Sequence, residues 1–141
     1  MLQAGQGVGV VMTAATSAGF RCTLVHGPSG AEVRTEAPRD NGGTGSSFSP
    51  TDLLGASLLS CALTTLALVA AREGIPFGDA SGTVEKRMVA DPHRRVAELP
   101  ITLVLPPLSP AHRARMEEVA RGCPVARSLH PDVRVEMTFL P

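Results

Sequence analysis

Two of the three cysteines in this 141-residue sequence occupy contrasting settings. Cys61 lies in Leu53 to Ala71, a run without a charged side chain that is typical of a central helix. Cys123 lies in Gly122-Cys123-Pro124, where one helix is expected to end and a short one to begin. A thiol in an apolar wall beside a thiol at a helix start would form a dithiol redox centre. This hypothesis requires the two residues to meet in space.

Each cysteine also has an interpretation without chemistry. A free cysteine such as Cys61 is commonly a small buried apolar residue, and as a nucleophile it would need a nearby cation, for which arginine is expected. At Cys123, backbone N–H groups and the helix dipole favour a thiolate, although the residue could simply fill a corner between helices. Cys22 lies in an expected strand and receives no role.

The composition limits the class of protein. The length fits one domain spanning residues 1–141, and 43% hydrophobic residues supply a core. A net charge of zero gives no electrostatic argument for nucleic acid or an anionic membrane as partner. Three dispersed cysteines do not resemble a secreted disulfide framework, and Met1 to Phe20 lacks the pattern of a signal peptide. We therefore expect a cytoplasmic protein.

Metal and cofactor sites are not expected. A zinc site would need ligands besides two cysteines, and none of the four histidines has ligand-like spacing to either; these are His26, His93, His112 and His130. The sequence contains no GxGxxG after a strand, no Walker motif and no GxSxG. We predict neither a metal nor a cofactor.

The first third of the chain is predicted to form an antiparallel meander. Strands are expected over Val8–Ala15, Arg21–His26 and Glu32–Glu36, with a turn at Gly27 to Gly30. The Gly/Ser-rich segment from Pro38 to Ser49 follows as a loop.

The longest expected element is a helix from Pro50 to about Glu73. Ser49 is placed as its N-cap, Pro50 at its first position, and Gly74 as its stop. Its uncharged run is long enough to span a membrane. Because the run contains four Ser or Thr residues and lacks an aromatic belt, a helix buried on all sides by sheets explains it better.

The remaining elements complete an α+β fold of order βββ-α-ββ-α-β. Strands are expected over Thr83–Ala90 and Val96–Leu105, and Pro100 within the latter implies an edge position or a bulge. Helices are expected over Pro110–Arg121 and from Pro124 to near His130. Alternating apolar and polar residues over Val133 to Phe139 indicate a half-buried last strand.

Several motifs follow one another along the chain, namely Phe48-Ser49-Pro50-Thr51-Asp52-Leu53-Leu54, then Cys61, then Cys123-Pro124-Val125 with Ser128-Leu129-His130-Pro131. Together they resemble the OsmC/Ohr family of thiol peroxidases (osmotically inducible protein C and organic hydroperoxide resistance protein). The resemblance spans nearly the whole chain. It implies an intertwined homodimer around a central buried helix, with active sites at the subunit interface.

The resemblance also implies the chemistry. Cys61 would be the peroxidatic residue, whose thiolate attacks an organic hydroperoxide and becomes a sulfenic acid. Cys123 would be the resolving residue that forms a disulfide with it. A dithiol reductant, such as a lipoylated protein, would then restore both thiols.

The family also uses an arginine to activate the thiolate and an acid to hold that arginine. Arg39 is the favoured counterpart here, with Arg21 as the alternative. The family's glutamate position, ten residues before the first cysteine, is Thr51, and Asp52 follows as a substitute. On a continuous helix Asp52 lies about 13.5 Å along the axis from Cys61, so it would hold an arginine of the other subunit or favour its own helix N-terminus.

Two other functions stay open. The departure at Thr51 motivates a module of the same fold that binds a small apolar ligand or senses redox state, with little peroxidase turnover. A structural dimer without chemistry would be favoured if Cys61 and Cys123 lay too far apart to bridge.

Overall fold

A computed structural model of the chain describes residues 7–141, which separate into two units, the first ending at Pro50 and the second spanning Thr51–Pro141. The expectation that Met1 to Phe20 holds no signal peptide falls partly outside the described residues. The expectation of one domain over residues 1–141 stays a prediction.

The first unit is the predicted antiparallel meander. Strands β1 (Met12–Ser17), β2 (Arg21–His26) and β3 (Glu32–Glu36) pair in that order. The prediction for β1 was wrong in its bounds, because the strand covers the six residues that pair with β2, from Met12 opposite His26 to Ser17 opposite Arg21. The following loop contains one short 3-10 helix, η1 (Arg39–Asn41).

In the second unit, the long helix α1 (Pro50–Glu73) begins and ends where the sequence predicts. Gly74 follows it with a φ of 66°, a left-handed conformation that glycine adopts without strain. One face of α1 is buried along residues three or four apart, which are Gly55, Leu58, Ala62, Leu66 and Ala70. At Gly55, an added Cβ would lie 3.3 Å from the Leu99 side chain, so the glycine permits close approach of helix and sheet.

The opposite face of α1 is exposed. The expectation that sheets bury this helix on all sides is therefore wrong for the single chain. The residues of this face are mostly small, namely Ser57, Ser60, Thr64, Ala67 and Ala71. Leu68 beside them is 49% exposed. By length and composition alone α1 could cross a membrane, which is weak evidence for a membrane span. Of the most apolar segment of the helix, 28% is buried.

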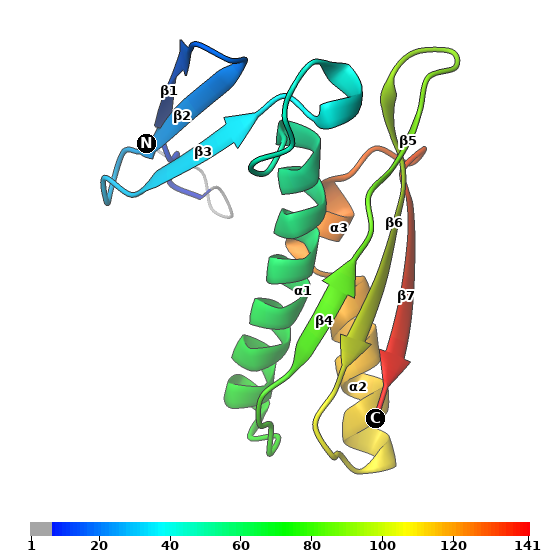
Figure 1. Ribbon diagram of the computed structural model, residues 1–141. Coiled ribbons are helices and arrows are strands. Elements are labelled where there is room, and N and C mark those ends of the chain that lie inside the picture. Colours follow the sequence, from blue (N-terminus) through cyan, green and yellow to red (C-terminus); the bar gives the residue numbers. More distant parts are fainter. Residues whose placement is uncertain (1–6) are drawn as a thin grey trace. The chain divides into compact units, whose positions relative to one another are not determined.

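The sheet of the second unit is mixed and has β6 (Arg95–Val104) at its centre (Figure 1). Strands β4 (Ser81–Val84) and β5 (Arg87–Val89) pair antiparallel with successive halves of β6, and β7 (Arg134–Leu140) pairs parallel with its other side. The predicted strand Thr83–Ala90 is thus two short strands. This break adds a strand to the predicted order, and the α+β class is confirmed.

The edge position predicted from Pro100 was wrong, because β6 has neighbours on both sides. Pro100, which has no backbone N–H to donate, lies near the break between β4 and β5. Its carbonyl accepts a hydrogen bond from the Glu85 amide at 3.0 Å. The register between β5 and β6 does shift, since Arg87 pairs with Glu98 but Met88 pairs with Val96. A bulge therefore lies close to Pro100 in the chain.

Two helices connect β6 to β7. Helix α2 (Pro110–Arg121) has Ser109 as N-cap, whose hydroxyl accepts from the His112 amide at 3.2 Å. Helix α3 (Pro124–Ser128) begins at the predicted proline and ends two residues before His130. Met116 and Ala120 of α2 are completely buried with Cys123 and the apolar residues of β6 in one core.

Candidate active site

Cys61 lies in the middle of α1 and is half-buried against the core of the second unit. Its sulfur lies 3.8 Å from the Thr65 hydroxyl, one helical turn further along α1. The side chain is therefore adjacent to the core and still partly open to solvent.

Cys123 is completely buried at the junction of α2 and α3. It is the N-cap residue of α3, with extended backbone at φ −62° and ψ 153°. Its carbonyl accepts from the Arg127 amide at 3.1 Å, and its amide donates to the Ala120 carbonyl at 3.3 Å. The junction that the sequence predicts from Gly122-Cys123-Pro124 thus fixes this residue.

The fold brings the two thiols together, as the redox hypothesis requires. Burial raises the pKa of the Cys123 thiol above its ordinary value, and both the charge of Cys61 and a hydrogen bond with Cys61 raise it further. The backbone N–H groups of Val125 and Ala126 lower this pKa, as expected at a helix start, although Cys123 forms no regular capping hydrogen bond with the residues described. The helix start favours a thiolate, as expected from the sequence, but burial outweighs it and the pKa of Cys123 is raised.

This arrangement separates the two cysteines chemically. A raised pKa means that Cys123 keeps its proton at neutral pH, so that its thiol can donate a hydrogen bond to the Cys61 sulfur. Cys61 is the more exposed of the two, so a substrate from solvent meets it first. The interaction between Cys61 and Cys123 argues against a structural dimer without chemistry, which was expected only for thiols too far apart to bridge.

Asp52 pairs with Lys86, the single lysine of the chain. The Lys86 ammonium lies 2.8 Å from Asp52 Oδ1 and donates to the Thr51 hydroxyl at 3.0 Å. Lys86 lies between β4 and β5, and its side chain is only 17% exposed. Both residues at the family's acid position therefore bind a cation of the second unit, a partner that the sequence analysis missed.

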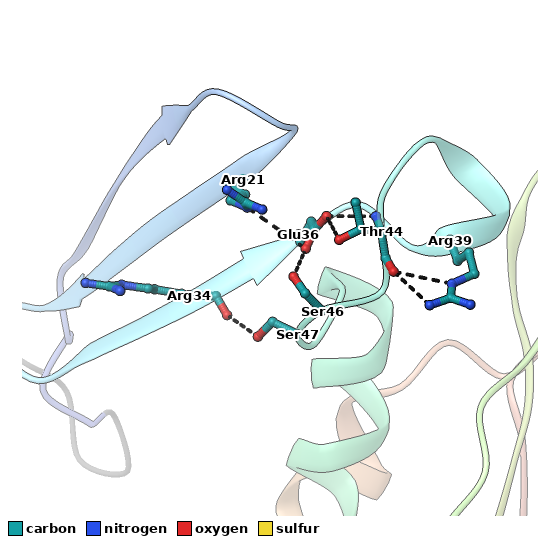
Figure 2. Close-up of polar contacts among 7 residues, drawn as sticks. All are labelled: Arg21, Arg34, Glu36, Arg39, Thr44, Ser46 and Ser47. Carbon is teal, nitrogen blue, oxygen red and sulfur yellow. Dashed lines mark hydrogen bonds and ion pairs between the residues drawn. The ribbon is translucent and has the colours of Figure 1, made fainter.

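Arg39 belongs to η1 of the first unit and is exposed. Its Nε and Nη2 donate to the Thr44 carbonyl at 3.3 and 3.0 Å (Figure 2). This contact orients the guanidinium within its own loop. Its predicted role toward Cys61 stays a prediction.

Arg21, the alternative arginine, lies on β2 at 4.0 Å from the carboxylate of Glu36 (Figure 2). Glu36 is only 2% exposed and accepts hydrogen bonds from the Ser46 hydroxyl and from the hydroxyl and amide of Thr44, the latter two at 2.7 and 2.8 Å. These bonds, with a smaller contribution from Arg21, lower the pKa of Glu36 to about 2. Thr44 thus connects Glu36 to Arg39.

Glu36 is the second polar residue that the sequence analysis missed. A glutamate at the end of a strand is usually exposed, and it is the hydroxyl-rich loop ten residues later that satisfies its carboxylate. The concentration of Ser and Thr in residues 44–47 was the available signal. Among residues 7–141, no group of three or more His, Cys, Asp or Glu side chains could hold a metal ion.

Comparison with known proteins places the chain in a family. The model of the OsmC-like protein family matches residues 43–138. A solved Psychrobacter arcticus structure, whose name refers to osmotic stress induction and a detoxification response, is 36% identical, with 97% of this chain and 99% of that chain covered and a TM-score of 0.85.

More distant relatives share the fold. An organic hydroperoxide resistance protein of Elizabethkingia anophelis is 17% identical, covering 96% of this chain and 98% of its own, with a TM-score of 0.79. One of Legionella pneumophila is 19% identical, covering 95% and 98%, with a TM-score of 0.77. No curated protein matches the sequence. Since the family model matches more than half of its residues, this chain belongs to the OsmC-like protein family.

Proposed function

We propose that this protein is a thiol-dependent peroxidase that reduces organic hydroperoxides through a Cys61 sulfenic acid and a Cys61–Cys123 disulfide. The observation that carries the proposal is the interaction of the half-buried Cys61 thiol with the completely buried Cys123 thiol. The names of the Elizabethkingia and Legionella relatives, which refer to organic hydroperoxide resistance, support the substrate class.

The reaction has three balanced steps. The Cys61 thiolate attacks the terminal oxygen of the hydroperoxide, the O–O bond breaks, and the alkoxide leaves as an alcohol after taking up a proton. The Cys123 sulfur then attacks the Cys61 sulfenic acid, and the displaced hydroxide leaves as water with the Cys123 proton. An external dithiol, such as a lipoylated protein, supplies two electrons and two protons to reduce the disulfide.

The proposal assigns the activating cation to Arg39, with Arg21 as the alternative, and the acid to Asp52. In the second unit Asp52 binds Lys86, so its contribution is to fix the start of the helix that carries Cys61. Measuring the turnover of Arg39→Gln and Arg21→Gln distinguishes the two arginines. Only replacement of the arginine that stabilises the Cys61 thiolate should lower the rate of the first step.

We also propose that the protein forms a homodimer and acts in the cytoplasm. The exposed face of α1 and several exposed apolar side chains of the first unit, Phe20 at 73% and Met12 at 62%, are surfaces that a second copy would cover. Sedimentation equilibrium tests the dimer, and a protein that stays monomeric at micromolar concentration would contradict it.

The test of the function is hydroperoxide consumption. With cumene hydroperoxide and dihydrolipoate, the wild type should turn over, Cys61→Ser should be inactive, and Cys22→Ser should match the wild type. Equal rates for the wild type and Cys61→Ser would overturn the proposal.

The alternative, a ligand-binding or redox-sensing module, is favoured by Thr51 at the family's acid position. Intact mass after one equivalent of hydroperoxide distinguishes the two. Loss of two hydrogen atoms within seconds supports the peroxidase, whereas an unchanged mass supports the module.

A further inference from the structure

A cavity of about 290 Å³ lies within the second unit, between α3, the residues that follow it, and β7. Its apolar lining consists of Ala126, Leu129, Pro131, Val133, Val135 and Met137. Val135 and Met137 alternate along β7, so their side chains share one face, and Val133 directly precedes the strand and extends this apolar row. Neither Cys61 nor Cys123 is among the lining residues described, although Ala126 borders both the cavity and Cys123.

Arg121, in the last turn of α2, also lines the cavity. Its guanidinium carbon lies 4.9 Å from the centre of the Phe139 ring, one step beyond Met137 on the same face of β7. Within the described part of the chain, Arg121 forms no hydrogen bond and no ion pair. Its neighbours differ, because Arg113 donates to the Phe139 carbonyl and Arg127 donates to the Gly122 carbonyl.

His130 supplies a second polar group to the lining. Its Nδ1 accepts a hydrogen bond from the Asp132 amide at 3.0 Å, and the Asp132 carboxylate lies 3.7 Å from the same nitrogen. Because Nδ1 accepts, the neutral ring carries its proton on Nε2 and keeps a free N–H donor there. The Asp132 side chain is not among the lining residues.

We infer that this cavity binds an aliphatic carboxylate of medium chain length. The apolar row would cover the hydrocarbon tail, because burial of methylene groups is favourable. The guanidinium of Arg121 would bind the carboxylate, for which its planar N–H groups are suited, and His130 would add a donor. From Val133 to Met137 the row spans at most roughly 13 Å, close to the length of an extended ten-carbon chain. This inference does not depend on the peroxidase proposal.

The test is a titration of the intact protein with decanoate, followed through ¹³C-labelled methionine methyl groups. The Met137 signal should shift and saturate, whereas that of Met88 on β5 should stay unchanged. Decanol and methyl decanoate carry a similar tail without the charge and separate a free acid from a neutral lipid.

Arg121→Gln should weaken decanoate binding at least tenfold and leave decanol binding within twofold. Arg72→Gln is the matched control, because Arg72 is likewise the basic residue in the last turn of its helix, α1. Ala126→Leu should abolish binding of both ligands by filling the cavity, and a ¹H–¹⁵N spectrum confirms that each variant is folded.

Three results would overturn the inference. They are a Met137 signal that decanoate does not move below its micellar concentration, equal decanoate affinities for Arg121→Gln and Arg72→Gln, or unchanged binding to folded Ala126→Leu. Cumene hydroperoxide turnover is measured separately, so failure of this inference and failure of the proposed function are distinguishable.

Discussion

The two units differ in what they bury. Every buried apolar residue of the described chain lies in the second unit, from Leu58 on α1 to Cys123 before α3. In the first unit the buried residues are polar, namely Thr35, Glu36 and Ser49. The first unit therefore depends on hydrogen bonds around one carboxylate, whereas the second depends on an apolar core.

This difference shows how one chain combines two kinds of site. The apolar core holds a thiol in its neutral form and brings another against it, which is the setting for exchange between sulfurs. A three-stranded sheet without an apolar core is marginal on its own. In the first unit, Glu36 holds Arg21 and the Thr44 carbonyl holds Arg39. Several apolar side chains of this unit are exposed.

The largest expected effect tests the core of the second unit. Leu58→Ala should reduce the free energy of unfolding by about 2–5 kcal/mol, because it creates a cavity where the side chain is completely buried. Val33→Ala in the first unit, where the side chain is 47% exposed, should cost about 0.5 kcal/mol or less. Urea unfolding measures both, and equal losses would refute the contrast between the units.

The next effect tests the polar network of the first unit. The lowered pKa of Glu36 means that its contribution to stability is complete above its ordinary value of 4.5 and is lost as pH falls through about 2. The amide signal of Thr44, which donates to Glu36, should therefore titrate with a midpoint near 2. Glu36→Gln should remove this titration and increase hydrogen exchange at Thr44. A midpoint near 4.5 in the wild type would contradict the arrangement.

A smaller effect is expected at alkaline pH in the second unit. The raised pKa of Cys123 favours its neutral thiol in the folded state, so the stabilisation is complete below the ordinary value of 9.0 and is lost as pH rises above it. Under reducing conditions, stability should fall more between pH 8 and 10 in the wild type than in Cys123→Ser. Cys22→Ser serves as the control, and it should behave as the wild type. Identical alkaline losses in all three proteins would show that burial of Cys123 has no such effect.

The smallest effect is expected at the ion pair between Asp52 and Lys86. Because the Asp52 side chain is 40% exposed, Lys86→Met should cost about 1 kcal/mol or less of unfolding free energy. Thermal unfolding at low and high salt measures it, and the difference from wild type should shrink as salt rises. A loss as large as that of Leu58→Ala would mean that a polar contact, rather than the apolar core, fixes α1.

The sequence by itself determined the elements whose ends depend on local chemistry. Helix α1 begins at Pro50 and ends before Gly74, α2 begins at Pro110, and α3 begins at Pro124, all as predicted. Proline restricts φ and lacks a backbone donor, and glycine accepts a left-handed backbone, so these residues act within one turn of themselves. The alternation of β7 was equally local.

Only the tertiary structure decided which residues pair and which interact. The bounds of β1 depend on β2, the break between β4 and β5 depends on β6, and the central place of β6 comes from a parallel neighbour more than thirty residues later. The interaction of Cys61 with Cys123 and the burial of Glu36 arise in the same way. Each depends on the free energy of surfaces that come together from distant parts of the chain, and local residue preferences do not contain that information.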